Sequence, residues 1–118
     1  MKFSLTSLLL AVSPAAVFAL NADQQGALNA HNAARATKGL PALKWDDSLA
    51  ASALQCANKI ASSGNFAHCQ AAENLWGRSA IGTNALTDAA KSWVSESANY
   101  HGEKIPDGNF GSYGHYST

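Results

Sequence analysis

The sequence predicts a small domain of mixed helices and strands, in the α+β class. Three stretches place apolar residues at the spacing of an amphipathic helix, and each has start and stop signals of its own. Two shorter stretches, residues 73–77 and 114–118, have the character of strands. The chain of 118 residues is long enough for one domain of common size but not for two.

Residues 1–19 are predicted to be a secretory signal peptide and not part of the domain. A single lysine is followed by an apolar run, and Val17 and Ala19 fill the two key positions of a cleavage site. The alternative is a membrane anchor, but a serine and a proline interrupt the apolar run and leave it too short to span a bilayer. We therefore expect secretion to the extracellular space, with a mature domain of residues 20–118.

The first helix is expected from Asp23 to Lys38. Asn21 or Asp23 can cap its start, Gly39 stands where a terminating glycine belongs, and Pro41 prevents continuation. One stripe of this helix mixes polar with apolar side chains, which is unusual for a helix that only packs into a core. The stripe includes Leu28, Asn32 or His31, and Arg35.

The second helix is expected to begin at Asp46 or Asp47 and to stop at Gly64. Its predicted buried stripe contains the apolar residues that recur at helical spacing: Leu49, Ala53, Cys56 or Ala57, and Ile60. Cys56 can form a disulfide with Cys69, because an intramolecular bridge suits a secreted domain of this size. Two free or intermolecularly paired thiols are the alternative.

The third helix is expected to begin at Thr87, as its N-cap, and to run to Tyr100. Glu96 falls on its apolar side, three residues after Trp93. A carboxylate there is costly unless it is paired, so either a partner or an edge position that reaches water must account for it. The remaining residues, 101–118, read as a Gly-rich loop that ends in the start of a strand.

Charge excludes some classes of partner. Beyond the signal peptide the chain carries seven Lys and Arg against eight Asp and Glu, so it is close to neutral. It has no basic stripe for nucleic acid or anionic lipid, and no charge run that predicts a disordered tail. We expect no nucleic-acid partner and no stable membrane anchor, and we make no prediction about protein partners.

Five segments, in order along residues 23–118, resemble the CAP superfamily of cysteine-rich secretory proteins, antigen 5 and pathogenesis-related class-1 proteins. They are similar to that family's HNxxR, LxW, GENLxxG, WxxExxxY and GHYTQ patterns, and the overall character is that of a fungal pathogenesis-related member. The segments read HNAAR (31–35), LKWDDSLAASA (43–53), AENLWG (72–77), AAKSWVSESANY (89–100) and GHYST (114–118).

The resemblance implies an α/β/α sandwich, in which a small antiparallel sheet lies between helices. It also implies a cleft of two histidines and two glutamates that binds a divalent metal in several members. Transferred onto this chain, the four residues are His68, Glu73, Glu96 and His115. Neutral imidazole and carboxylate suit zinc, and magnesium is the second candidate.

Other residues receive a structural role from the same resemblance. The HNxxR segment implies that His31, Asn32 and Arg35 tie the first helix to the neighbouring backbone. His101 has no partner that the pattern names, so we expect it to face solvent.

The chain also departs from the family pattern. Ala72 stands where the family has glycine, which predicts strain if its φ is positive. Cys56 and Cys69 are additional to the pattern and imply a private disulfide beside His68. The strands that follow GHYTQ in the family lie beyond Thr118, so we expect a truncated CAP domain whose sheet would have unpaired edges.

The leading functional hypothesis is a secreted protein that binds sterols or other small lipids and holds a metal in its cleft. Four aromatic residues of the C-terminal loop can line an apolar pocket, or can simply pack the edge of the core: Tyr100, Phe110, Tyr113 and Tyr116. The alternative is a metal-dependent hydrolase with Glu73 or Glu96 as general base, although the chain has no HExxH helix. A nonfunctional fragment is a third possibility.

Overall fold

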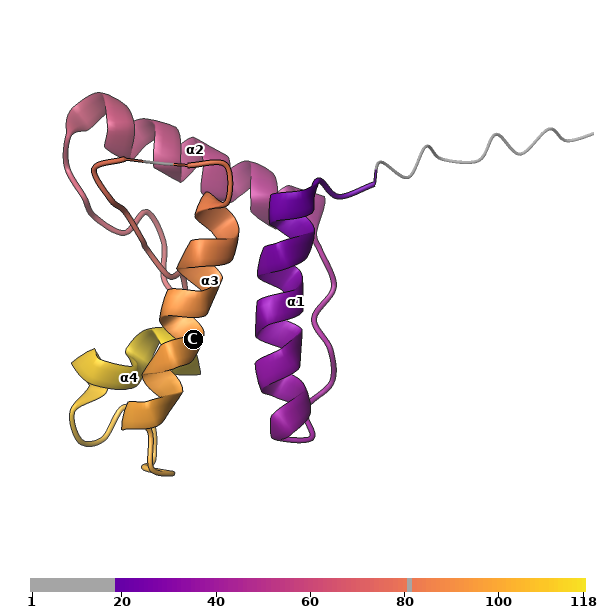
Figure 1. Ribbon diagram of the computed structural model, residues 1–118. Helices are drawn as coiled ribbons and strands as arrows, with labels where there is room; N and C mark the ends of the chain where they lie inside the picture. The colour runs from indigo at the N-terminus through magenta and orange to yellow at the C-terminus, as the bar shows by residue number, and fades with distance from the viewer. Residues whose placement is uncertain (1–18, 81) are drawn as a thin grey trace, which may run out of the picture.

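The structure, a computed structural model, describes residues 19–80 and 82–118, which form helices joined by loops (Figure 1). The predicted signal peptide therefore lies outside the described residues, except for Ala19. The elements in chain order are α1 (Ala22–Thr37), α2 (Asp47–Ser63), α3 (Ala85–Ser95), the 3-10 helix η1 (Glu96–Asn99) and α4 (Phe110–Ser117).

The two predicted strands do not form within the described part of the chain. Residues 73–77 are an irregular loop, and residues 114–117 belong to α4, a helix where a strand was expected. A strand is stable only when other strands pair with it, and residues 19–80 and 82–118 provide none. The described residues form helices only, and the α/β/α sandwich implied by the resemblance is not seen among them.

Helix α1 begins where the sequence predicts it. Of the two candidate caps, Asn21 takes the position: its side chain accepts the N–H of Gln24, and the Gln24 side chain accepts the N–H of Asn21. This reciprocal capping box satisfies two backbone donors that the first turn leaves free. After Thr37 the chain turns through Gly39, whose φ of 66° is readily adopted by glycine alone.

Helix α2 also follows its local signals. The Asp46 side chain accepts the N–H groups of Ser48 and Leu49, and Gly64 ends the helix in the left-handed region with a φ of 70°. The prediction that its apolar stripe is buried is wrong for most of the stripe. Cys56 is buried, but Leu49 is 65% exposed.

Helix α3 begins at Ala85, two residues before the predicted N-cap Thr87. The cap comes from a distant residue: the carboxylate of Asp23, in the first turn of α1, accepts the N–H groups of Leu86 (2.9 Å) and Thr87 (2.8 Å). The Thr87 hydroxyl donates in return to the carbonyl oxygen of Asp23. A capping bond from another helix could not be read from local sequence, which is why the predicted start was late.

Helices α1 and α3 lie side by side and form the main packed unit (Figure 1). Ala89 and Ala90 of α3 are buried, with exposed fractions of 5% and 1%. Gly26 of α1 faces Thr87 so closely that an added Cβ would collide with its hydroxyl oxygen. Small side chains therefore allow the two helices to approach each other.

A second packed unit joins η1 to α4. Tyr113 is its centre, 1% exposed, with its ring 5.2 Å from that of Tyr100 and 5.5 Å, edge-on, from that of Phe110. The Tyr113 hydroxyl donates to the carbonyl oxygen of Asp107. Such offset and edge-on arrangements are the favourable ones for aromatic pairs, so this cluster anchors α4.

Helix α2 differs from the others because it packs against none of the described helices. It crosses above α1 and α3 in Figure 1 and leaves several large apolar side chains exposed, among them Leu49 and Leu54. None of the helices in the described part of the chain has the length and apolar character needed to cross a membrane.

Candidate functional site

The four residues predicted as a metal site lie in two histidine–glutamate pairs. Glu96 and His115 come from η1 and α4, whereas His68 and Glu73 come from the irregular loop after α2. In each pair a ring nitrogen, Nδ1, points to a carboxylate oxygen, at 2.7 Å for His115–Glu96 and 3.3 Å for His68–Glu73. The same histidine–glutamate arrangement thus occurs twice, once in the loop after α2 and once between η1 and α4.

The Glu96–His115 pair is held by the backbone of α4. One oxygen of Glu96 accepts the His115 Nδ1 contact, and the other accepts the N–H groups of His115 (3.0 Å) and Tyr116 (3.3 Å). The side chain of Glu96 is 21% exposed. The sequence required a partner for the Glu96 carboxylate on the apolar side of the predicted third helix, and His115 is that partner.

The His68–Glu73 pair is held by the loop itself. The Glu73 carboxylate accepts the N–H groups of Cys69 (2.5 Å) and Gln70 (3.2 Å). Partial burial acts to raise the pKa of Glu73, but the two N–H groups and His68 together lower it below its usual value. Glu73 is therefore anionic at neutral pH, which suits a role beside a cation.

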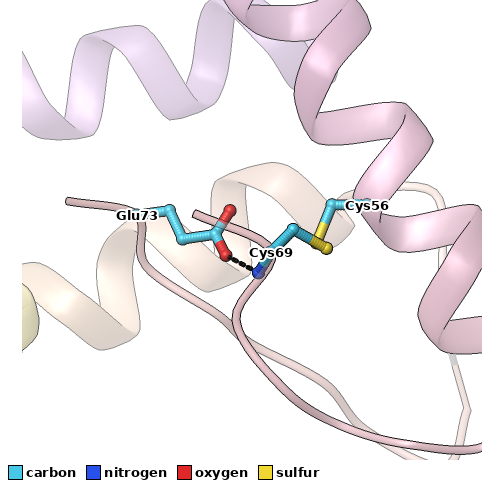
Figure 2. A group of neighbouring side chains, drawn as sticks. All are labelled: Cys56, Cys69 and Glu73. Atoms are coloured by element: carbon cyan, nitrogen blue, oxygen red, sulfur yellow. Dashed lines mark hydrogen bonds between the residues drawn. A yellow bond between two sulfur atoms is a disulfide. The ribbon is translucent and has the colours of Figure 1, made fainter. Parts of the chain in front are cut away.

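A disulfide joins Cys56 of α2 to Cys69, the residue after His68 (Figure 2). The Cα atoms are 5.9 Å apart. Figure 2 shows the Glu73 carboxylate directed at the N–H of Cys69, next to the bridge. The intramolecular pairing left open by the sequence is thus the one that forms.

Three of the four predicted residues share one small cavity. His68, Glu73 and His115 line a space of about 260 Å³, together with Asn74, whose side chain donates to the carbonyl oxygen of His115 at 2.8 Å. Glu96 does not line this space and contacts His115 on its Nδ1 side. The two pairs therefore face a common volume, with Glu96 behind its histidine.

The four side chains do not form one closed cluster of ligand atoms. Among residues 19–80 and 82–118, three or more possible ligand atoms lie within 4.8 Å of one another only at Cys56, Cys69 and Glu73. Two of those three are joined as a disulfide, and it is the thiolate that binds metal. To bind one ion, the side chains of His68, Glu73, Glu96 and His115 would have to move closer together.

The donor chemistry of the paired residues fits zinc. Because each Nδ1 faces a carboxylate, each imidazole keeps Nε2 free for a metal, in the carboxylate–histidine arrangement common at zinc sites. In that arrangement the glutamates orient the rings, although either carboxylate can also supply an oxygen ligand. Two imidazole ligands with carboxylate neighbours suit zinc better than magnesium, which prefers oxygen ligands and water.

A much larger open cavity adjoins the small one. It has a volume of about 1210 Å³ and shares Glu73, Asn74 and His115 with the small cavity as lining residues. Its walls are mostly apolar and come from α1, α2, α3, α4 and the loops that connect the helices. They include Leu43, Ala53, Ile60, Phe66, Trp76, Trp93 and Ile105.

The aromatic residues predicted to line a pocket divide between two roles. Tyr100 and Tyr116 line the large cavity, and Phe110 lines the small one. Tyr113 is buried in the cluster that anchors α4. Pocket lining and core packing, the two alternatives for this group, therefore both occur.

The HNxxR residues belong to α1, and two of them bond to the backbone of the loop that follows it. Asn32 exchanges two hydrogen bonds with the backbone of Leu43, and Arg35 donates from Nε to the carbonyl oxygen of Pro41 at 2.7 Å. His31 lines the large cavity, with its ring 6.3 Å from that of Trp93. Burial, and then the nearby Arg35, lower the pKa of His31, which favours the neutral ring.

Sequence reasoning missed two residues of the cleft. Asn74 bridges the halves by its bond to the backbone of His115, and Trp93 lies with its ring 6.3 Å from His115 on one side and from His31 on the other. Their signals were available, because each stands in a segment that the resemblance already marked. His101, expected to face solvent, is exposed in its loop.

Comparisons with known proteins show which family the chain resembles. The profile of the cysteine-rich secretory protein family, CAP, matches residues 28–118. Pathogenesis-related protein 1C of Nicotiana tabacum is 42% identical over 81 residues, which cover 66% of this chain and 47% of that protein. Pathogenesis-related protein 1 of Arabidopsis thaliana is 36% identical over 81 residues, covering 67% and 49%. The chain spans about half the length of these relatives, and no solved structure gives a significant match.

Proposed function

This chain belongs to the cysteine-rich secretory protein (CAP) family, and from that premise we propose that it is an extracellular protein that binds sterols or other small lipids. We propose further that the His/Glu cleft holds a divalent metal, with zinc as the favoured ion. The relatives that it matches are named as pathogenesis-related proteins, which supports a place in that class. The predicted signal peptide, residues 1–19, supports secretion.

The observation that carries the lipid proposal is the large open cavity. Ligand sites are typically concave, mostly apolar and furnished with a few polar groups that orient the ligand. The cavity of about 1210 Å³ has mostly apolar walls, and its polar lining includes Glu73, Asn74 and His115, which also line the small cavity. A sterol matches this pattern, because it has a long apolar body and a single hydroxyl group at one end.

The metal proposal rests on the paired donors. His68 and His115 would offer Nε2, while Glu73 and Glu96 would hold the two rings in orientation and supply negative charge. A bound zinc ion would supply positive charge and Lewis acidity to whatever polar group reaches the shared end of the two cavities. The chain's own contribution is to bring both histidines to the small cavity.

Lipid binding is tested with a fluorescent sterol analogue, displaced by unlabelled sterol or by fatty acid. We expect Ala57→Trp to weaken binding by at least about tenfold, because a bulky ring in the cavity removes the space that the ligand occupies. Ala51→Trp is the matched control, since Ala51 is an exposed alanine of α2 that does not line the cavity. Equal binding by both variants and the unmodified chain would remove the cavity from the proposal.

The role of the metal is tested with the double variant His68→Ala, Glu96→Ala. We expect it to lose zinc uptake but to keep sterol binding, since the apolar walls remain. Peptide cleavage is measured in the same samples, with and without zinc. Zinc-dependent cleavage that disappears in the double variant would instead support a metal-dependent hydrolase.

A further inference from the structure

We propose that the Cys56–Cys69 disulfide positions the His68–Glu73 half of the cleft, so that the redox state of this bridge sets how tightly the cleft binds a divalent metal. The proposal rests on the metal site of the preceding section and adds a form of regulation to it. It concerns one half of the site only. The Glu96–His115 half belongs to another part of the molecule.

The bridge has one firm end and one exposed end. Cys56 is 6% exposed and is the buried residue of α2, whereas every residue from Ala61 to Ala72 is exposed. An exposed loop with few buried contacts opens locally at low free energy. The covalent link to Cys56 is therefore what restricts the loop at Cys69.

The restricted residue is the one that orients Glu73. The N–H groups of Cys69 and Gln70 both donate to the Glu73 carboxylate, and the chain returns to make these bonds through Ala72, whose φ is 54°. A non-glycine residue with positive φ is strained, so the loop does not favour this turn by itself. The bridge fixes the position of Cys69, so that its N–H can donate to the Glu73 carboxylate.

His68 depends on the same arrangement. It precedes Cys69 directly, its side chain is 57% exposed, and its Nδ1 lies 3.3 Å from Glu73. An exposed histidine–carboxylate contact of this kind contributes little on its own. Both groups of this half are thus placed by the backbone around Cys69, whereas Glu96 and His115 are placed by α4 and its buried Tyr113.

Opening the bridge is an ordinary thiol–disulfide exchange. Two molecules of a small thiol supply two electrons and two protons, the sulfur–sulfur bond breaks, Cys56 and Cys69 become thiols, and the small thiol leaves as its own disulfide. Cys69 is then tied to α2 only through the intervening loop. Reoxidation restores the positioned state.

The first test is a zinc titration by calorimetry on the full chain, comparing the bridged form with the double variant Cys56→Ser, Cys69→Ser. We expect the variant to bind zinc about 10- to 100-fold more weakly, as is typical when groups that orient metal ligands are lost. On a background of His68→Ala and Glu73→Ala, removing the bridge should cost nothing further, because both groups that it positions are gone. Leu54→Ala, at an exposed residue of the same helix outside the cavity lining, should bind as the unmodified chain does.

The second test needs no metal. Amide exchange at positions 69 and 70 is followed by NMR in the bridged chain, after reduction, and in each case with Glu73→Gln. In the bridged chain we expect Glu73→Gln to speed exchange at both positions by about tenfold or more, whereas after reduction it should change little. A purely structural bridge would instead alter exchange equally with or without the Glu73 carboxylate.

The outcomes separate this proposal from the function on which it rests. If the bridged chain binds no zinc, the metal part of the proposed function fails, while amide exchange still decides whether the bridge positions Glu73. Equal zinc affinity with and without the bridge overturns the positioning role. So does tighter cobalt binding after reduction with a sulfur-to-cobalt charge-transfer band, since the cysteines would then be ligands.

Discussion

The α1–α3 pair and the α2 region are built on different principles. Helices α1 and α3 are joined by packing of small buried residues and by the bonds from Asp23 to the start of α3. Helix α2 packs on no other described helix and is joined to the site loop by a disulfide. The two halves of the candidate site differ in the same way: Glu96 and His115 are held by noncovalent packing of η1 and α4 around Tyr113, whereas His68 and Glu73 lie in the loop that the disulfide holds.

Removing the disulfide should give the largest difference in stability between the α2 region and the α1–α3 pair. With Cys56→Ser and Cys69→Ser, we expect α2 and the site loop to lose about 3 kcal/mol of stability, because a cross-link across 13 residues no longer restricts the unfolded chain. Hydrogen exchange measured residue by residue should show lost protection in α2 and retained protection in α1 and α3. Equal loss throughout would mean that the two regions unfold as one.

A large side chain at the buried position Ala90 of α3 should destabilise the α1–α3 region. Ala90 is 1% exposed, so Ala90→Leu has no free space to occupy and should lower the free energy of unfolding by about 1–3 kcal/mol. Ala33→Leu, at an exposed alanine of α1, is the control and should stay within about 0.5 kcal/mol of the unmodified chain. Urea denaturation measures both. A neutral Ala90→Leu would show that the helix contact is loosely packed.

Relieving the strain at Ala72 should strengthen the weaker region. With a φ of 54°, Ala72 lies in the left-handed region, where a Cβ costs about 1–2 kcal/mol, so Ala72→Gly should stabilise the loop by about 1 kcal/mol after the added freedom of the unfolded chain is counted. Ala71→Gly, which relieves no such strain, should give no gain. Thermal melts of the two variants provide the comparison, and a gain from both would point to a general effect of glycine.

Acid should weaken the α1–α3 junction through Asp23, the smallest expected effect. Partial burial acts to raise the pKa of Asp23, but the N–H groups of Leu86 and Thr87 and the Thr87 hydroxyl outweigh it and hold the pKa below its usual value. A group with a depressed folded pKa stabilises the fold above its unfolded pKa and loses that contribution as pH falls through the folded value. Relative to Asp23→Asn, the unmodified chain should therefore be more stable at neutral pH.

That difference should shrink below about pH 4. Melts of both proteins between neutral pH and pH 3 make the comparison, since the other carboxylates titrate equally in the two chains. A difference that stays constant across this range would show that the charge of Asp23 does not contribute to the cap.

Features set by neighbouring residues could be predicted from the sequence. The caps at Asn21 and Asp46 and the glycine stop at Gly64 were either found or among the alternatives, because each is satisfied within one helical turn. The start of α3 was predicted late because its cap is Asp23, in another helix. The end of the chain was predicted as a strand, but burial of Tyr113 against Tyr100 stabilises a helix there.

The site was predictable in composition but not in arrangement. The resemblance placed His68, Glu73, Glu96 and His115 together, and three of them do line one cavity. It could not show that each histidine would face its own glutamate, or that Asn74 would join the two halves, because these depend on tertiary geometry. Of the four aromatic residues predicted to line an apolar pocket, Tyr100 and Tyr116 line the large cavity. Its other walls could not be predicted, since a helix stripe reads the same whether it is covered or open.

The long-range cap of α3 also has a consequence for how the chain is made. Asp23 leaves the ribosome more than sixty residues before Leu86 and Thr87, the groups that it caps. Helices α1 and α2 can form as they emerge, but α1 has no partner for its docking face until residue 87 has been synthesised. Closing so long a loop costs chain entropy before any packing offsets it. During cotranslational folding, α1 therefore pairs with α3 only after α1 and α2 have been synthesised. The loop that carries His68 and Glu73 lies in the sequence between α2 and α3, so it has also been synthesised by then.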